Sequence, residues 1–290
     1  MANVAPLGPD DSIATQLLIP CGILQVIVVV LYVARMYARL HPVPKLWLDD
    51  YTISLATAIS ITGYALQIAA CKHGLGRHNA YVTSREQAAA LHYLFGLYSI
   101  WVVGVGLVRV SIACTLLRVW DVKAWRWTLW ALIIVQMISV TSTFIVQFTE
   151  CHPLRAMWDV VPGAKCWTPA QMHTFGYVFA ITNIALDFVL SLMPIAFLRR
   201  LRRPLAERIV IAFLMALGLV ATAAAIIKTS YMRDFAITGD TLRDIVHINM
   251  WCKIEEQLGI VAYSTNGSHV LSSIDRQCGH VDTGEGAKRG

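Results

Sequence analysis

The sequence predicts an all-α, polytopic membrane protein, built as a bundle of seven transmembrane helices whose seventh helix is weak or truncated. Composition is the first reason. Of 290 residues, 57% are apolar and only 14% are charged, whereas about a quarter of the residues in a soluble domain are charged. The second reason is that several long runs contain no charged residue. Because about 20 apolar residues form a helix that crosses a bilayer, these runs argue against an ordinary soluble domain.

Six segments are apolar enough to predict transmembrane helices. In chain order they are Ile13–Ala34, Tyr51–Cys71, Ala88–Val108, Trp127–Phe148, Phe175–Leu198 and Ile209–Ile227. Asp187, within the fifth segment, is the single charged residue inside them. Each segment has the length that a bilayer requires, so six spans are predicted from apolar character alone.

The seventh segment, residues 245–263, is much weaker. It carries Lys253, Glu255 and Glu256 among its apolar residues. Charges at that depth are costly unless other helices cover and pair them. The sequence therefore predicts a seventh span only if these side chains face the interior of the bundle.

The distribution of basic residues predicts orientation and boundaries. In a soluble domain the net charge of +6 would suggest a nucleic-acid partner, but none is expected here, because the basic residues lie in short loops beside apolar runs. We expect residues 1–12 outside or in the lumen, a seven-helix membrane domain over 13–263, and a polar, disordered cytoplasmic tail over 264–290. This orientation places eleven basic residues in inner loops, against eight in outer ones: Arg35, Arg39, Lys45, Arg118, Lys123, Arg126, Arg199, Arg200, Arg202, Arg203 and Arg208.

Polar side chains inside the predicted spans are the candidate site residues. Arg109 lies well inside its apolar run, and Asn183 and Asp187 are four residues apart, so the latter two share one helix face. Arg109 either pairs with a carboxylate or extends toward the inner headgroups. Arg109 with Asp187, and Lys253 with Glu255 or the glutamate after it, are candidate pairs that the sequence alone does not assign.

The polar stretch Glu150–Thr168 interrupts two apolar runs and carries two cysteines. Cys151 and Cys166 both fall on the predicted outer, oxidising side, so we expect a disulfide between them. Closing a loop of this length contributes about 3 kcal/mol. Cys71 remains a competing partner, because connectivity cannot be read from spacing.

Two further groups of residues are given structural interpretations. Cys71, His73 and His78 have no spacing typical of a metal site, so no metal is expected. Asp49 and Asp50 precede an apolar segment, where carboxylates favour the N-terminus of a helix. A metal or partner contact is the less favoured interpretation of these two aspartates.

An ordered series of short motifs resembles a known family. The match covers Arg35 to about Ala262 and rests on RMYARL, WLDDY (Trp47–Tyr51), GLGRH (Gly74–His78), RVSIACTLLRV, ECHPLRAMWD with GAKCW, TNIALDFVLSLMPI (Thr182–Ile195), a basic loop and WCKIEEQLGIVA. In this order the motifs resemble the fungal rhodopsin-domain integral membrane proteins. That family includes the satratoxin-cluster membrane protein and seven-helix receptor-like proteins of filamentous fungi.

The resemblance implies seven helices, a membrane location and no demonstrated biochemical activity. Two departures from the family pattern stand out. Family members commonly have Lys where this chain has Arg109, which keeps the charge but changes its geometry. They also continue the seventh helix into a proline-containing segment with a basic end, whereas Tyr263 here leads directly into a polar segment. A truncation, a splice variant or a gene-model error would produce that end.

The word rhodopsin does not by itself imply retinal. A retinal protein needs a lysine in the seventh helix and a nearby anionic partner, and Lys253 lies in that helix. The third segment, however, offers Arg109 where an anion would help. We therefore expect no cofactor and interpret Lys253 as a structural residue.

The sequence leaves enzyme activity open and supports two classes of function. The first is a non-enzymatic receptor-like or accessory membrane protein, tied to a secondary-metabolite gene cluster. It would take an unidentified small lipophilic ligand and a cytoplasmic protein partner at its basic inner loops. The second is a membrane-embedded cyclase or isomerase that acts on a lipophilic biosynthetic intermediate. No catalytic residue is assigned, but Asp187 and Glu255 are the candidate acids, because burial favours a neutral carboxyl group.

Overall fold

The computed structural model describes residues 11–41, 48–119, 123–198, 205–234 and 240–285, which form seven α-helices. These are α1 (Ala14–Leu40), α2 (Leu48–Lys72), α3 (Ser84–Val119), α4 (Lys123–Thr149), α5 (Pro169–Leu198), α6 (Leu205–Asp234) and α7 (Thr241–Glu285). The short elements are the 3-10 helices η1 (Asn79–Tyr81) and η2 (Leu154–Met157) and the strands β1 (Cys151–His152) and β2 (Lys165–Cys166). The all-α fold class is confirmed.

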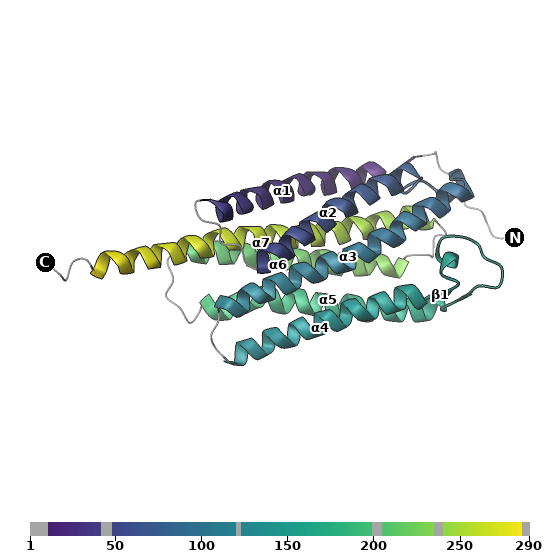
Figure 1. Cartoon of the computed structure of the whole chain (residues 1–290). Coiled ribbons are helices and arrows are strands. Elements are labelled where there is room, and N and C mark those ends of the chain that lie inside the picture. Colours follow the sequence, from purple (N-terminus) through teal and green to yellow (C-terminus); the bar gives the residue numbers. More distant parts are fainter. Residues whose placement is uncertain (1–10, 42–47, 120–122, 199–204, 235–239, 286–290) are drawn as a thin grey trace.

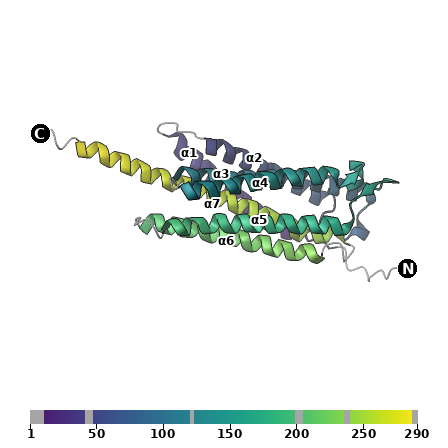
Figure 2. The same cartoon turned by 90° about the horizontal axis from the view of Figure 1, so that it is seen from below.

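The helices lie lengthwise beside one another, and β1 and the loop around it cover one end of the bundle (Figure 1). Each helix packs on its neighbour in the chain, and α1 also packs on α7, so the seven helices close into a ring. Turning the molecule shows α7 passing obliquely behind α3 and α4 (Figure 2), and α3 and α7 are in contact. These two helices are therefore positioned to carry an interior site.

The outer surface of the bundle is apolar. Ile23, Ile138 and Ile181 are each more than half exposed, although water would not favour such a surface. In the described part of the chain, α1 to α5 are long and apolar enough to cross a membrane. The side chains of residues 205–215 in α6 are not among those described. The protein is a multi-pass membrane protein.

Capping boxes stand at the start of α3 and of α5, at the end of the bundle that carries β1. We call this end the disulfide end. Thr83 and Glu86 form a reciprocal capping box before α3, since each side chain accepts a hydrogen bond from the backbone N–H of the other. Thr168 and Gln171 repeat this arrangement before α5. Capping satisfies backbone donors that a helix leaves free.

The turn between α2 and α3 depends on two glycines. Gly74 and Gly76 have φ angles of +96° and +93°, a region that a side chain disfavours. A Cβ atom at Gly76 would also lie 2.9 Å from the Ala14 backbone nitrogen. These glycines therefore allow a tight turn and a close approach to α1.

α7 extends further than the predicted seventh segment, which ended at Tyr263. Its 45 residues continue to Glu285, past the ends of the other helices (Figure 1). The backbone of residues 264–285 is therefore helical where we expected a disordered polar tail. The physical reason is that extending an existing helix is far easier than starting one, and residues 264–285 contain no proline.

Candidate functional site

Arg109, on α3, is the centre of a buried polar network. Its Nε and Nη2 atoms lie 2.8 Å from the two carboxylate oxygens of Asp187 on α5, a bidentate pair. Nη2 also donates to Glu255 Oε1 on α7 at 2.9 Å. Nη1 donates to Gln136 Oε1 on α4 at 3.3 Å and to Asn183 Oδ1 on α5. All three guanidinium nitrogens therefore have acceptors, and Arg109 is paired inside the bundle.

Glu255 extends these contacts to α6. Its second oxygen, Oε2, accepts a hydrogen bond from Lys228 Nζ at 2.7 Å. The same ammonium lies 4.8 Å from the ring centre of Trp101, within reach of a cation–π interaction. Trp101 in turn donates to the backbone oxygen of Cys252 at 2.9 Å. These contacts connect five helices, α3, α4, α5, α6 and α7. We call the residues that make them the Arg109 network: Arg109, Gln136, Asn183, Asp187, Lys228 and Glu255.

Helix geometry explains part of this convergence. Asn183 and Asp187 lie one turn apart on α5, so both side chains reach Arg109. The Asn183 Nδ2 group donates to the Phe179 backbone oxygen at 2.7 Å, which directs its Oδ1 atom toward the guanidinium group. The sequence placed Lys228 among the basic residues of the outer connections, because it stands near the end of an apolar run, whereas the structure buries its ammonium beside Glu255.

The Arg109 network is electrically balanced. Arg109 and Lys228 are cations, Asp187 and Glu255 are carboxylates, and each charge has an opposite partner within 3 Å. Burial of a lone charge is expensive, whereas a paired and fully hydrogen-bonded group can be tolerated. These pairs explain how four ionisable side chains remain inside an apolar bundle.

The pocket described beside Arg109 is small. It is lined by Gln136 and by apolar side chains of α3, α4 and α5, with a volume of about 10 Å³. A cavity needs a volume of at least about 10–15 Å³ to hold one water. All four oxygens of Asp187 and Glu255 also accept from cationic groups, so a proton on either carboxyl group would displace a partner.

A second buried pair lies on α7 beside the first. Lys253 Nζ donates to Glu256 Oε2 at 2.6 Å and to the Ser60 backbone oxygen on α2 at 3.3 Å. Two glycines make room for the pair: a Cβ atom at Gly63 would lie 2.7 Å from Lys253 Nζ, and one at Gly104 would lie 2.7 Å from Glu256 Oε1. The structure thus pairs Lys253 with the second glutamate, a choice that the sequence left open.

The polar contacts continue from Ser60 toward α1. Ser60 Oγ donates to Gln25 Oε1 at 3.0 Å, and Gln257 Nε2 donates to the same oxygen and to the Cys21 backbone oxygen, each at 3.0 Å. These residues were not predicted as site residues, because single glutamines in apolar runs give little signal. We call the following set the Lys253 network: Gln25, Ser60, Lys253, Glu256 and Gln257.

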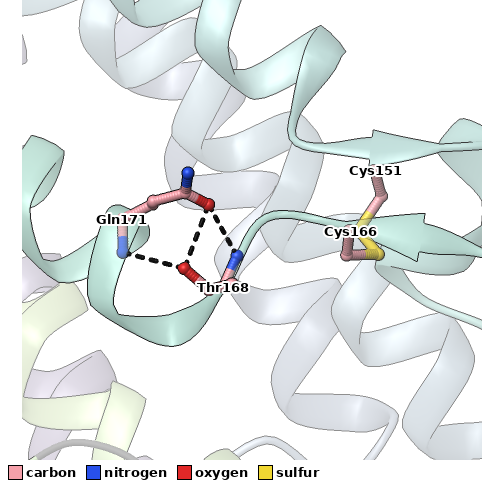
Figure 3. Close-up of a disulfide and its surroundings, with 4 residues drawn as sticks. All are labelled: Cys151, Cys166, Thr168 and Gln171. Atoms are coloured by element: carbon pink, nitrogen blue, oxygen red, sulfur yellow. Dashed lines mark hydrogen bonds between the residues drawn. A yellow bond between two sulfur atoms is a disulfide. The ribbon is translucent and has the colours of Figure 1, made fainter.

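The predicted disulfide between Cys151 and Cys166 is present (Figure 3). It joins β1 and β2, which pair antiparallel with these two cysteines opposite each other. Cys71, the competing partner, is a free cysteine. Trp158, inside the closed loop, stacks on His92 of α3 at 4.6 Å between ring centres. The loop is thereby held against the end of α3.

At the disulfide end, a solvent-facing cluster of polar side chains is joined by hydrogen bonds. His78 Nδ1 lies 2.9 Å from Asp240 Oδ2, and His78 Nε2 lies 2.9 Å from Arg243 Nη1. A His78 ring with its proton on Nδ1 satisfies both contacts. The hydrogen bond with His78 lowers the pKa of Asp240, and that with Arg243 lowers the pKa of Asp11. His78 therefore connects the turn before α3 to the start of α7.

At the opposite end of the bundle, Asp50 forms ion pairs with α1. The sequence favoured only a role for its carboxylate at the start of a helix. Its carboxylate oxygens lie 3.1 Å from Arg35 Nη2 and Arg39 Nη1 on α1. The Asp49 side chain lies outside the described set, as do Lys45 and the basic residues Arg199–Arg203. The predicted partner surface at the basic loops therefore falls mainly outside the described residues.

Within the described ranges, no group of three or more His, Cys, Asp or Glu side chains is arranged to hold a metal ion.

Comparison with known proteins identifies one relationship. A family model described as fungal rhodopsin domain matches residues 34–271, which is most of the chain. No curated protein and no solved structure matches the chain significantly.

Proposed function

Because the chain belongs to the fungal rhodopsin domain family, we propose that it is a non-enzymatic, receptor-like membrane protein in which all seven helices cross the bilayer. The observation that carries this proposal is the Arg109 network, whose paired charges link α3, α5, α6 and α7. Such a network holds one arrangement of the helices. A ligand that favours a second arrangement would act by exchanging these partners.

The two ends of the bundle supply the other parts of the proposal. At the disulfide end, the loop closed by Cys151 and Cys166 lies against α3, so a small lipophilic ligand would enter beside it. At the other end, the basic segment Arg199–Arg203 would meet an acidic cytoplasmic partner. If the basic segment faces the cytoplasm, the N-terminus, which leads into α1 at the other end of the bundle, lies outside the cell or in the lumen. A link to a secondary-metabolite gene cluster rests on the family resemblance alone.

The contacts favour this function over a membrane-embedded cyclase or isomerase. A catalytic acid must hold a proton next to its substrate, but both oxygens of Asp187 and of Glu255 accept from Arg109 or Lys228. The pocket lined by Arg109 and Gln136 has a volume of about 10 Å³, which is about enough for one water. A lipophilic intermediate would need helices to separate before it reached either carboxyl group.

Metabolite profiling tests the choice between the two functions. Fungal cells that lack the gene are complemented with the wild-type chain, with Asp187→Asn or with Glu255→Gln, and membrane levels of each protein are measured. We expect no lipophilic precursor to accumulate in cells carrying either variant. Accumulation of one precursor, at normal membrane levels of the variant, would establish the enzyme and reject our proposal.

Distance measurements test the receptor-like arrangement directly. Spin labels at Arg85→Cys on α3 and Ser230→Cys on α6 report the separation of two exposed sites at the disulfide end. The background carries Cys71→Ser, Cys114→Ser and Cys278→Ser, so that these thiols take no label. In wild-type protein we expect one narrow distance distribution. Asp187→Asn should add a second one, because it weakens the contact between α3 and α5. An unchanged distribution would show that the network does not select between helix arrangements.

A further inference from the structure

Three buried glutamines meet where α1, α2 and α7 pack together. Gln25, Gln67 and Gln257 are exposed by 7%, 0% and 0%. Gln257 donates to Gln25 at 3.0 Å, and both Gln257 and Gln67 lie beside Cys21, through its backbone oxygen and its thiol respectively. We call these three residues the glutamine cluster.

Several polar atoms of the glutamine cluster have no partner among the described residues. Gln25 Nε2 and Gln257 Oε1 are two of them, and the two amide atoms of Gln67 have no partner stronger than the Cys21 thiol, a weak hydrogen-bonding group. Burying such an atom without a hydrogen bond lowers the stability of the folded protein. Three neighbouring glutamines with four atoms that lack a strong partner point to a bound group that hydrogen-bonds to them.

Exchanging amide nitrogen and oxygen does not remove these unpartnered atoms. Gln25 Oε1 accepts from both Ser60 Oγ and Gln257 Nε2, so turning the Gln25 amide would place two donors face to face. Turning Gln257 would set its oxygen against the backbone oxygen of Cys21. The orientations of both amides are therefore determined by their existing hydrogen bonds.

We propose that the glutamine cluster binds ordered water. The four atoms are two amide nitrogens, which donate, and two amide oxygens, which accept. A metal cation would satisfy the oxygens alone, whereas water both donates and accepts and bridges buried polar groups in this way.

Two buried cysteines allow water to be detected. Cys21 lies beside Gln67, whereas the backbone oxygen of Cys252 accepts a hydrogen bond from Trp101, next to the charge-paired Lys228 and Glu255. X-ray footprinting of the full chain in lipid nanodiscs generates hydroxyl radicals from bound water, and these radicals oxidise nearby cysteines. We expect Cys21 to be oxidised several-fold faster than Cys252, although Cys21 is the less exposed of the two. Equal or slower oxidation of Cys21 would reject the water site.

A substitution tests the same site through stability. Replacing Gln67 with Met keeps the side-chain length but removes both amide atoms. If these atoms bind water, the Gln67→Met variant loses hydrogen bonds, its midpoint of thermal unfolding falls, and oxidation of Cys21 slows. If the site is dry, removing two unsatisfied atoms raises the midpoint, which would overturn the proposal. Leu17→Met, in the adjoining apolar cluster, is the matched control and should change neither measurement appreciably.

Discussion

The Arg109 network and the Lys253 network lie on two sides of the same helix and differ in how completely their polar atoms are paired. Glu255 and Glu256 are consecutive on α7, so their side chains diverge by about 100° around the helix axis. Both oxygens of Glu255 accept from cations, whereas Glu256 has one paired oxygen and one without a partner among the described residues. The comparison shows that two identical neighbouring residues act differently because of what the opposing helices present to them.

The difference in pairing affects how firmly each network holds the helices that it joins. Two cations and two carboxylates fix α3, α5, α6 and α7 in the Arg109 network, and moving any one of these helices breaks at least one charge pair. In the Lys253 network, the Lys253 ammonium donates to a neutral backbone oxygen on α2, and the contacts to α1 join neutral amide groups. Neutral hydrogen bonds are weaker and can be replaced by water, so α7 is held more loosely on this side.

The most disruptive test removes the cation that pairs with two carboxylates. Arg109→Met should destabilise the protein by about 3–5 kcal/mol, because it leaves buried carboxylates without a full set of partners. Thermal unfolding in detergent measures the loss. Adding Asp187→Leu should recover much of it, since Lys228 still pairs with Glu255. Wild-type stability of the single variant would show that the network is not what holds these helices.

Removing the cation on the other side of α7 should have a smaller effect. Lys253→Met leaves one carboxylate unpaired, and bound water can solvate it in part, so we expect a loss of about 2–3 kcal/mol. The same unfolding measurement compares it with Arg109→Met. Combining it with Glu256→Gln, which removes the unpaired charge, should restore most of the stability. A loss larger than that of Arg109→Met would reverse the comparison.

A methyl group added at Gly104 tests the packing around Glu256 without changing any charge. We call Gly63 and Gly104, which leave room for side chains of α7, glycine notches. Gly104→Ala would bring a Cβ atom to 2.7 Å from Glu256 Oε1 and 3.1 Å from Ile59 Cγ2, so overpacking should cost about 1–3 kcal/mol. Gly96→Ala is the matched control on α3. Its Cβ atom would meet Leu66 at 3.9 Å, an ordinary contact, and alanine favours a helix by about 1 kcal/mol. Opposite shifts of the unfolding midpoint are expected.

The weakest effect is expected from the solvent-facing cluster, whose charges titrate. Hydrogen bonding with His78 lowers the pKa of Asp240 below its ordinary value of 3.8. A lowered carboxyl pKa contributes stability that is complete above the ordinary value and is lost as the pH falls through the lowered one. Asp240→Asn should therefore unfold at a lower temperature than wild type at about pH 6, and the difference should shrink at about pH 3. A constant difference would show that the charge of Asp240 is not involved.

Some features of the site followed from single residues. Arg109 and Asp187 stood out because an ionisable group inside an apolar run must find a partner, and the structure pairs them. Cys151 and Cys166 stood out because both fall in one polar loop between apolar segments. Lys228 and the glutamines did not, and Asp50 stood out only as a carboxylate at a helix N-terminus, since the roles of all these residues depend on which helix faces them. No spacing within one helix carries that information.

The sequence by itself determined that this protein is a helical membrane protein, because apolar runs of bilayer length have no other way to satisfy their backbone hydrogen bonds in lipid. It also determined which side chains could not remain alone inside the bundle. The tertiary structure decided the partners. Helix packing placed Lys228 beside Glu255, and glycine notches on α2 and α3 left space for Lys253 and Glu256. Pairing between helices depends on their rotation and separation, which are set by the packing of all seven helices together.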